Sequence, residues 1–193
     1  SASSGEIVLE CKEISHLPIG ERIARGLALV PEDRQRFGLV QTMSVGQNLS
    51  LASIMEFTRG IFTSVRLERA LIQKSIRDVT VKTDGPDVPI GSLSGGNQQK
   101  VVIAKWLATA PKVIILDEPT KGIDIGSKAA VHGFMAELVA QGLSVIMVSS
   151  ELPEILGMSD RVVVMREGRI AATYENKGLD AETLVRTAAG IAA

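Results

Sequence analysis

The sequence has little of what several protein classes require. It has one cysteine, Cys11, so no internal disulfide can form, which suits a reducing compartment. Lys and Arg total 21 against 22 Asp and Glu, and the net charge of −1 lacks the electrostatic footprint of a nucleic-acid-binding protein. With four Phe, one Trp and one Tyr, the chain must build an aliphatic core. Disulfide-rich, collagen-like and disordered classes are excluded, and no nucleic-acid partner is expected.

Long apolar runs are also absent. Unbroken apolar runs stop at four residues, as in residues 113–116, so no segment is long enough to span a bilayer. The first twenty residues lack a basic stretch followed by an apolar one, so we expect no secretory signal. A chain of 193 residues is long enough to bury an aliphatic core. We therefore expect a cytosolic protein.

The second half of the sequence alternates strands and helices. Residues 113–116 and 143–148 are almost wholly apolar, which is typical of strands buried on both faces of a parallel sheet. Between them, residues 127–139 carry apolar side chains at helical spacing, and Gly142 follows as a stop. A strand–helix–strand unit of this kind closes right-handed into a parallel sheet. The pattern predicts an α/β fold.

The other expected elements are less regular. We predict helices over residues 19–25, 98–108 and 180–189, the last capped by Asp180, a strand at Leu27–Val30 and a hairpin of residues 161–165 and 169–173. Residues 7–11 read as an edge strand in which Cys11 is a small buried side chain. Residues 44–80 read as helical throughout, with polar breaks near 58–60 and 63–64. We predict an α/β core (residues 1–43 and 94–193) with an inserted helical subdomain (residues 44–93).

Two adjacent carboxylates, Asp117 and Glu118, follow the apolar strand at 113–116 directly. Burying such charges costs several kcal/mol unless they are paired or bound to metal, and ligands of parallel sheets bind at this strand end. Asp117 would hold Mg²⁺, and Glu118 would polarise or deprotonate an attacking water. The alternative is a solvated acidic strand end that begins a turn at Pro119.

A glycine-rich stretch, residues 91–100, precedes the predicted helix at 98–108. Unpaired N–H groups at a helix start favour phosphate, and Gly95 and Gly96 allow close backbone approach while Ser94 supplies a hydroxyl. The alternative is an ordinary turn in which Ser94 caps the helix. The stretch is not a P-loop, because Asn97 and Gln98 stand where Lys and Ser or Thr are required.

These motifs together resemble a known family. LSGGNQQK (residues 93–100) is similar to the signature motif of ABC-type ATPases, and LDEPT (116–120) to their Walker B motif. KGID (121–124) is similar to their D-loop, which ends at Asp124. Together with VPEDR (30–34), SSELPEI (149–155) and GMSDR (157–161), they resemble the second ATPase half of simple-sugar importers of the ribose, xylose and galactose type.

The sequence departs from the family pattern at three places. No Walker A motif occurs in the printed sequence, so we expect a P-loop NTPase core that lacks its phosphate cradle and a chain that is inactive alone. Ser150 stands at the position of the switch histidine and Glu32 at that of the Q-loop glutamine. Both changes weaken the expectation of fast hydrolysis at this half's own site.

The resemblance implies ATP and Mg²⁺ as ligands. It implies that Ser94, Gly95, Gly96, Asn97 and Gln98 contact ATP held by a first ABC half of the same polypeptide, while Asp117 and Glu118 serve a second ATP. It further implies a transmembrane sugar permease docked around residues 38–84, an external sugar-binding protein, and a cytoplasmic location on the inner face of the plasma membrane. The fragment is also expected to self-associate through its incomplete sheet. The alternatives are a regulatory half with little hydrolysis of its own and a soluble ABC ATPase without a transport role.

Overall fold

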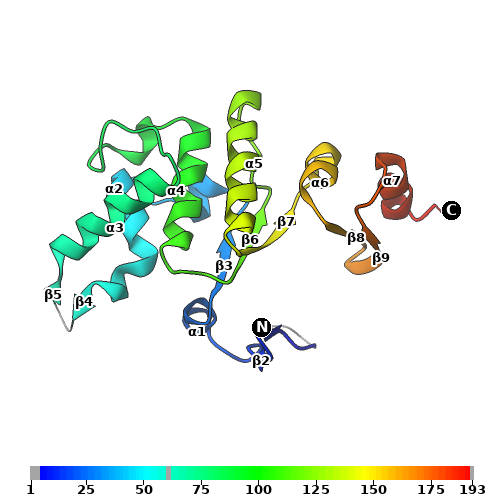
Figure 1. Cartoon of the computed structure of the whole chain (residues 1–193), viewed down its shortest axis with the longest axis horizontal. Coiled ribbons are helices and arrows are strands. Elements are labelled where there is room, and N and C mark those ends of the chain that lie inside the picture. Colours follow the sequence, from blue (N-terminus) through cyan, green and yellow to red (C-terminus); the bar gives the residue numbers. More distant parts are fainter. Residues whose placement is uncertain (1–4, 60–61, 192–193) are drawn as a thin grey trace. The chain divides into compact units, whose positions relative to one another are not determined.

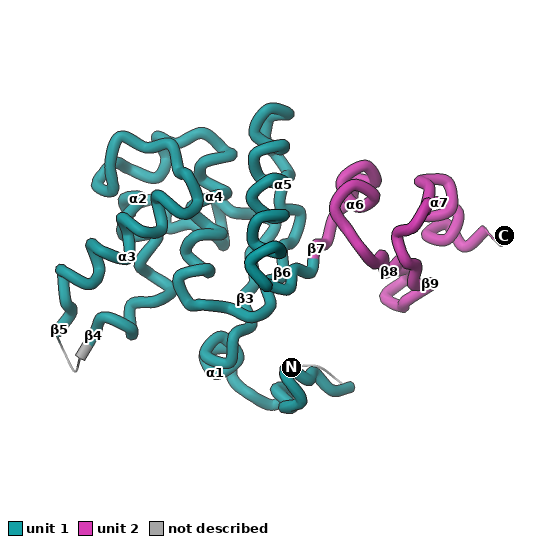
Figure 2. The backbone as a smooth tube through the Cα atoms, in the orientation of Figure 1, with its two compact units in different colours: residues 1–146 teal, residues 147–193 magenta. Residues whose placement is uncertain are grey.

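The chain divides into two units. The structure, a computed structural model, describes residues 5–59 and 62–191 (Figure 1). Unit 1 comprises residues 1–146 and unit 2 residues 147–193 (Figure 2). Each unit is described by itself. Within the described residues, no helix is long and apolar enough to cross a membrane.

A three-stranded sheet with the order β3-β6-β7 lies at the centre of unit 1. Strands β3 (Leu27–Val30) and β6 (Val113–Asp117) pair in parallel, with Leu27 opposite Val113. Strand β7 (Ser144–Val148) completes the sheet and crosses the boundary between the units. The predicted α/β fold with parallel strands is confirmed.

The two faces of this sheet differ in burial. Alternate side chains of β3 and β6 are buried (Ala28, Val30, Ile114 and Leu116). Leu29 and Ile146 are half exposed, at 49% and 52%. The prediction that both apolar strands are buried on both faces was wrong for β7, where Ile146 and Val148 are half exposed, whereas in β6 the alternate residue Ile115 is partly buried.

Two long helices follow the predicted pattern. Helix α4 (Gly95–Leu107) packs against β3 and α5 and has a fully buried run, Val101–Val102–Ile103–Ala104. Helix α5 (Ile125–Ala140) buries Val131, Phe134, Met135 and Leu138. Both predicted helices are confirmed, although α4 begins three residues before the expected residue 98. The earlier start places Gly95 and Gly96 inside the first turn of α4.

The predicted helical subdomain contains helices and a hairpin. Helices α2 (Val45–Ser50) and α3 (Val65–Asp78) are present, and a 3₁₀ segment, η2 (Leu51–Glu56), follows α2. Strands β4 (Thr58–Arg59) and β5 (Phe62–Thr63) then form an antiparallel pair. The prediction of helix throughout residues 44–80 was wrong at this pair, which lies where the polar breaks were seen; Gly60 itself lies outside the described residues. The boundaries of the subdomain stay a prediction.

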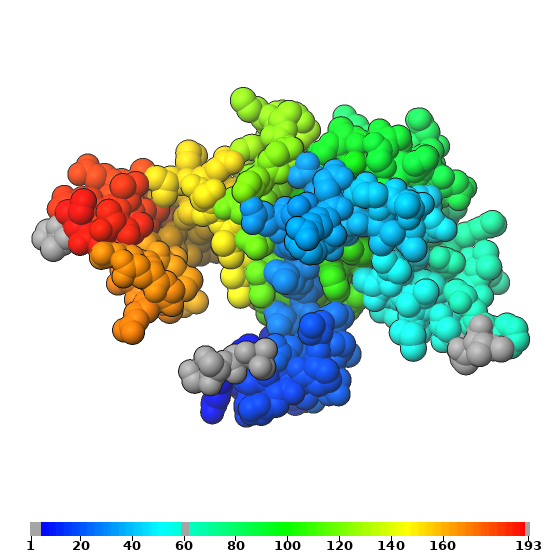
Figure 3. All heavy atoms as spheres, turned by 180° about the vertical axis from the view of Figure 1, so that it is seen from behind, coloured from blue at the N-terminus to red at the C-terminus, as the bar shows by residue number. Residues whose placement is uncertain are grey.

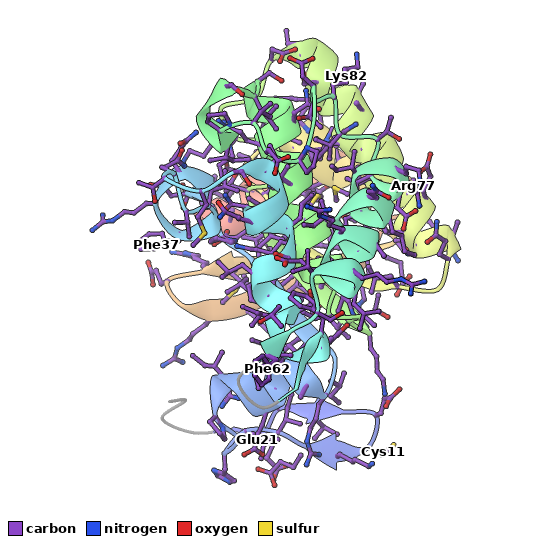
Figure 4. The ribbon with its side chains drawn as sticks, turned by 90° about the vertical axis from the view of Figure 1, so that its left-hand side faces the viewer. Cys11, Glu21, Phe37, Phe62, Arg77 and Lys82 are labelled. Carbon is purple, nitrogen blue, oxygen red and sulfur yellow. The ribbon has the colours of Figure 1, made fainter. Side chains whose placement is uncertain are left out.

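The N-terminal segment forms a small hairpin. Strands β1 (Val8–Leu9) and β2 (Lys12–Glu13) pair antiparallel around Glu10 and Cys11, which have φ values of 49° and 60°. Cys11 is exposed in this turn (Figure 4). The predicted strand at 7–11 with a buried Cys11 was therefore wrong, because the chain reverses at these two residues. Helix α1 (Ile19–Ala24) follows as predicted.

Unit 2 has its own small core. Helix α6 (Leu152–Met158) precedes strands β8 (Arg161–Arg166) and β9 (Arg169–Glu175), which pair antiparallel, and helix α7 (Ala181–Ala189) closes the unit. Val162, Val164 and Leu184 form its buried cluster. The predicted hairpin is confirmed, as is the cap on α7, where Asp180 accepts from the Thr183 N–H at 2.7 Å.

Candidate functional site

Asp117 and Glu118 form an acidic tip at the C-terminal end of β6. Asp117 is the last residue of the strand, and both carboxylates are half buried. Glu118 has a φ of 47°, a left-handed conformation that a residue with a side chain seldom adopts. Strain of this kind costs about 1–3 kcal/mol and is found mostly at functional sites. Five other non-glycine residues of the described chain also have a positive φ, so at Glu118 it marks the tight turn that ends β6.

Tight turns lead from the acidic tip through the D-loop (residues 121–124) to α5. The Lys121 N–H donates to the Glu118 carbonyl at 3.1 Å, and the Ile123 N–H to the Thr120 carbonyl at 3.2 Å. Asp124 then caps α5 by accepting from the Ser127 N–H at 2.9 Å. Hydrogen bonds from the side chain and then the backbone of Ser127 hold the pKa of Asp124 below its usual range. Asp124 is thus an ionised cap at the start of α5.

Glu32 pairs with the D-loop. Its carboxylate accepts a hydrogen bond from Lys121 Nζ at 2.5 Å, and both side chains are exposed. The hydrogen bond to Glu32 and its charge raise the pKa of Lys121, with smaller contributions from the charges of Glu118 and Asp117. The charges of Glu32, Glu118 and Asp117 therefore all act on Lys121. Lys121 links Glu32 to the acidic tip.

The signature loop (residues 93–98) turns into the start of α4. Ser94 is exposed and extended, and its hydroxyl makes no bond to the backbone of the helix. It accepts instead from Asn97 Nδ2 at 3.0 Å. The alternative in which Ser94 is an ordinary helix cap is therefore wrong. The first N–H groups of a helix have no partner within it, so an uncapped start can receive an anion.

Two glycines allow other groups to approach the start of α4. A Cβ built on Gly96 would lie 2.7 Å from Ser127 Cβ of α5. A Cβ built on Gly95 would lie 2.8 Å from Arg34 Nη2. Gly91, in the same stretch of sequence, has no heavy atom within 4 Å of the equivalent position. Gly96 is therefore required by close packing, a side chain on Gly95 would displace the end of Arg34, and Gly91 has open space.

Asn97 and Gln98 support the loop from within. Asn97 Oδ1 accepts from the Lys82 N–H at 2.9 Å. Gln98 is buried, and its side-chain amide donates to the Ile90 carbonyl at 3.2 Å. These bonds hold the neighbouring loops against α4. Contact of either residue with a nucleotide stays a prediction.

Arg34 was missed as a site residue. It begins a short π-helical turn, η1 (Arg34–Gly38), and its guanidinium donates to the carbonyls of Lys121 at 2.8 Å and Gly122 at 3.1 Å. It thereby joins the segment after β3 to the D-loop and lies beneath Gly95. The VPEDR motif contained this residue, but the 87 positions between Arg34 and Lys121 hide the contact from sequence patterns.

The residues at this edge fit a magnesium ion that is shared with a phosphate. No group of three or more Asp, Glu, His or Cys within the described ranges could hold a metal by itself. Mg²⁺ in phosphate-transfer sites takes one or two carboxylates and completes its shell with phosphate oxygens and water. Asp117, as a half-buried carboxylate at the strand end, meets that requirement.

A cleft in unit 1 lies away from these residues. A cleft of about 850 Å³ is lined by residues including Leu107, Pro111, Val113 and Ser144. Val113 begins β6 and Asp117 ends it, so the cleft lies at the opposite end of the strand from the acidic tip. Its charged lining residues pair with one another, Lys74 with Asp78 and Lys112 with Glu10. Because these four side chains are already in ion pairs, none of them leaves an unpaired charge for a phosphate in this cleft.

Comparison with known proteins decides the family. Residues 1–121, which include the signature loop and the acidic tip, match the sequence profile described as "ABC transporter". The chain belongs to the ABC transporter family. The predicted resemblance to this family is thereby confirmed, and nucleotide binding is the property that its members share.

Curated relatives of this ABC protein are named for sugar import. It is 57% identical to a ribose import ATP-binding protein of Rhizobium meliloti (strain 1021), over 98% of this chain and 38% of the relative. It is 45% identical to a xylose import ATP-binding protein of Ralstonia nicotianae, over 96% of this chain and 36% of the relative. The chain thus spans little more than a third of these relatives.

Solved structures confirm the ABC fold. An ATP-binding cassette of an ABC transporter has a TM-score of 0.79 at 24% identity, over 96% of this chain and 77% of that one. A dimeric cassette in a post-hydrolysis state, bound to ADP and Pi, has a TM-score of 0.74 at 22% identity, over 92% of this chain and 75% of that one. At these identities the likeness concerns the fold alone.

The last predicted site residue of this ABC protein, Ser150, lies in unit 2. It is exposed in the segment between β7 and α6. The neighbouring Ser149 hydroxyl accepts from the Glu151 N–H at 3.0 Å and donates to Glu154. The turn before α6 is therefore held by Ser149, which leaves the Ser150 backbone in a defined place. A part for Ser150 in hydrolysis stays a prediction.

Proposed function

We propose that this chain is part of the ATP-hydrolysing subunit of an importer for simple sugars. One observation carries the proposal: Arg34 and the D-loop bring the signature loop and the acidic tip to one edge of the sheet. This is the edge at which α/β proteins bind ligands. The names of the relatives supply the substrate class, ribose and xylose among them.

The two halves of the site would serve different nucleotides. Ser94, Gly95 and Gly96 would contact the γ-phosphate of an ATP held by a first ABC half of the same polypeptide. The uncapped start of α4 supports this, because it presents N–H groups and a hydroxyl toward an incoming anion.

Asp117 and Glu118 would act on the second ATP. Asp117 would hold Mg²⁺, which supplies charge neutralisation to the phosphates when it is bound. Glu118 follows the strand end directly, and its half-buried side chain would orient a water and accept its proton. Glu32 would approach the same site from β3, and its ion pair with Lys121 must open before Glu32 can contact a ligand.

Transport requires further partners. A transmembrane permease would dock against residues 38–84, and an external sugar-binding protein would deliver the sugar. This chain would then lie at the inner face of the plasma membrane. Residues of this segment form part of the surface of unit 1 in Figure 3. Met55 and Phe62 are 79% and 76% exposed, and Phe37 projects just before the segment (Figure 4). Such side chains suit an apolar contact with a helix.

A regulatory half with little hydrolysis of its own is the second candidate. The observation that favours it is the Glu32–Lys121 pair, which occupies the side chain at the Q-loop position. The acidic strand tip favours hydrolysis, because Asp117 and Glu118 put two half-buried carboxylates at the edge where ligands of α/β sheets bind.

Steady-state ATPase measurements on the full-length polypeptide test the proposal. Gly95→Asp places a carboxylate against phosphate, and we expect it to lower the rate about a hundredfold. Because Ser150 and Glu32 weaken this half's own site, we expect Glu118→Gln to lower the rate less than about tenfold. Gly91→Asp is the matched control and should retain activity, since that position is open. Equal losses for Gly95→Asp and Glu118→Gln, or a larger loss for Glu118→Gln, contradict the proposal.

A further inference from the structure

We propose that Arg34 is a positioning residue that holds the D-loop and the signature glycine Gly95 as one rigid group. Its effect on ATP hydrolysis rests on the function proposed above, whereas its effect on the loops does not. The argument uses the contacts of its guanidinium, the shape of Gly95 and the anchoring of the segment that carries it.

The guanidinium of Arg34 bridges two successive carbonyl groups. Nη1 donates to the Lys121 carbonyl at 2.8 Å, and Nη2 to the Gly122 carbonyl at 3.1 Å. A planar fork with fixed N–H directions can satisfy two carbonyls at once, which the single ammonium of lysine does less well. Nε is buried and has no hydrogen-bond partner among the described residues. The side chain is therefore aimed at the D-loop by both of its terminal nitrogens.

Gly95 leaves the space that the guanidinium occupies. A Cβ on Gly95 would lie 2.8 Å from Nη2 and 3.4 Å from the Gly122 carbonyl oxygen. A side chain there would push the guanidinium away from its acceptors. Gly95 thus leaves room for the Arg34 guanidinium and, in the proposed function, for a phosphate.

The segment that carries Arg34 is itself anchored. Asp33 Oδ1 accepts from the N–H groups of Gln35 and Arg36 at 3.1 and 3.0 Å, which fixes the start of η1. Glu32 adds a second link to the D-loop through Lys121. Gln35 Nε2 donates to Gln98 Oε1 of α4 at 2.5 Å, so a movement of this segment acts on both the D-loop and the start of α4. In the proposed function, residues 32–34 lie near the second ATP and the signature loop contacts the first. These contacts would therefore link the two nucleotide sites.

Hydrogen exchange of the full-length polypeptide tests the link. We expect Arg34→Lys to speed amide exchange about tenfold in residues 93–97 and 118–124, and to leave exchange in β8 and β9 within twofold of wild type. Arg36→Lys is the matched control, because the Arg36 guanidinium lies over the Phe37 ring, 5.1 Å from its centroid, and not at the D-loop. A purely structural role would speed exchange throughout unit 1, and that result, like unchanged exchange at 118–124, overturns the proposal.

ATPase kinetics give a second test. We expect Arg34→Lys to lower kcat about tenfold and to change KM for ATP less than twofold, because the loops lose alignment while the main nucleotide contacts remain. Gly95→Ala displaces the same guanidinium, so the loss of the double variant should be clearly smaller than the product of the two single losses. Losses that multiply overturn the proposal.

A failure of the proposed function and a failure of the Arg34 proposal give different results. If the wild-type polypeptide hydrolyses no ATP, the proposed function fails, while the exchange experiment still decides whether Arg34 orders the loops. If Arg34→Lys does not fold, Gly95→Ala alone decides: faster exchange at 118–124 supports the link, and unchanged exchange there overturns it.

Discussion

At the scale of a single residue, Asp124 belongs to the D-loop and also caps a helix. It ends the D-loop, and its ionised carboxylate caps α5 through Ser127. An anion at a helix N-terminus is favourable because the unpaired N–H groups and the helix dipole are positive there. A residue that the family resemblance marks for its loop therefore also has a measurable part in stability.

We expect Asp124→Asn to change how stability depends on pH. The folded-state pKa of Asp124 lies below the ordinary 3.8, so its contribution is complete above that value and is lost as pH falls through the folded pKa. Asn can still cap the helix but does not titrate. Free energies of unfolding measured from pH 7 to pH 2 should show a difference between wild type and variant that shrinks in acid. A constant difference across this range would contradict this account of the cap.

The site residues were predictable from sequence only where local chemistry marks them. Asp117 and Glu118 stand out as paired carboxylates after an apolar strand, and Gly95 and Gly96 as glycines before a helix. Arg34 carries no such mark. Its role depends on carbonyl groups of the main chain 87 and 88 positions away, which any residue could supply. Contacts of that kind appear only when the fold is known.

At the scale of elements, the contact between α4 and α5 depends on Gly96. A Cβ on Gly96 would lie 2.7 Å from Ser127 Cβ, an atom next to the backbone that cannot turn aside. Overpacking of this kind costs about 1–3 kcal/mol, and the better helix propensity of Ala returns about 1 kcal/mol at most. The two helices must therefore separate if Gly96 gains a side chain.

Gly96→Ala should accordingly lower the free energy of unfolding by about 1–2 kcal/mol in urea denaturation. Gly91→Ala is the control and should change it by less than about 0.5 kcal/mol, since its Cβ meets open space. Equal effects of the two variants would show that α4 and α5 are less closely packed than the structure has them.

Elements with a recognisable apolar pattern were predicted, and the two-residue strands were not. Helices α4 and α5 and strands β3 and β6 have apolar patterns that extend over a whole element. The pairs β1–β2 and β4–β5 have two residues in each strand, too few to show an alternation. The reversal at Cys11 depends on two left-handed residues, Glu10 and Cys11, neither of which is glycine. Composition alone does not mark such a turn.

At the scale of the whole molecule, the chain spans just over a third of its curated relatives. In the sheet of unit 1, Leu29 and Ile146 are half exposed, while Ile115, opposite Leu29, is partly buried. The printed sequence contains no Walker A motif, so we expect calorimetry on this chain alone to show no binding of Mg-ATP at micromolar concentrations. Micromolar affinity would mean that the signature loop and the acidic tip hold a nucleotide without a partner.

The central claim is that the signature loop and the acidic tip serve different nucleotides. Hydrogen exchange of the full-length polypeptide, with and without Mg-ATP, measures protection at both places at once. With Asp117→Asn, the account predicts that ATP still protects residues 93–97, while protection at 117–118 is lost. Loss of protection at both places together would show that one nucleotide contacts both, and would contradict the account.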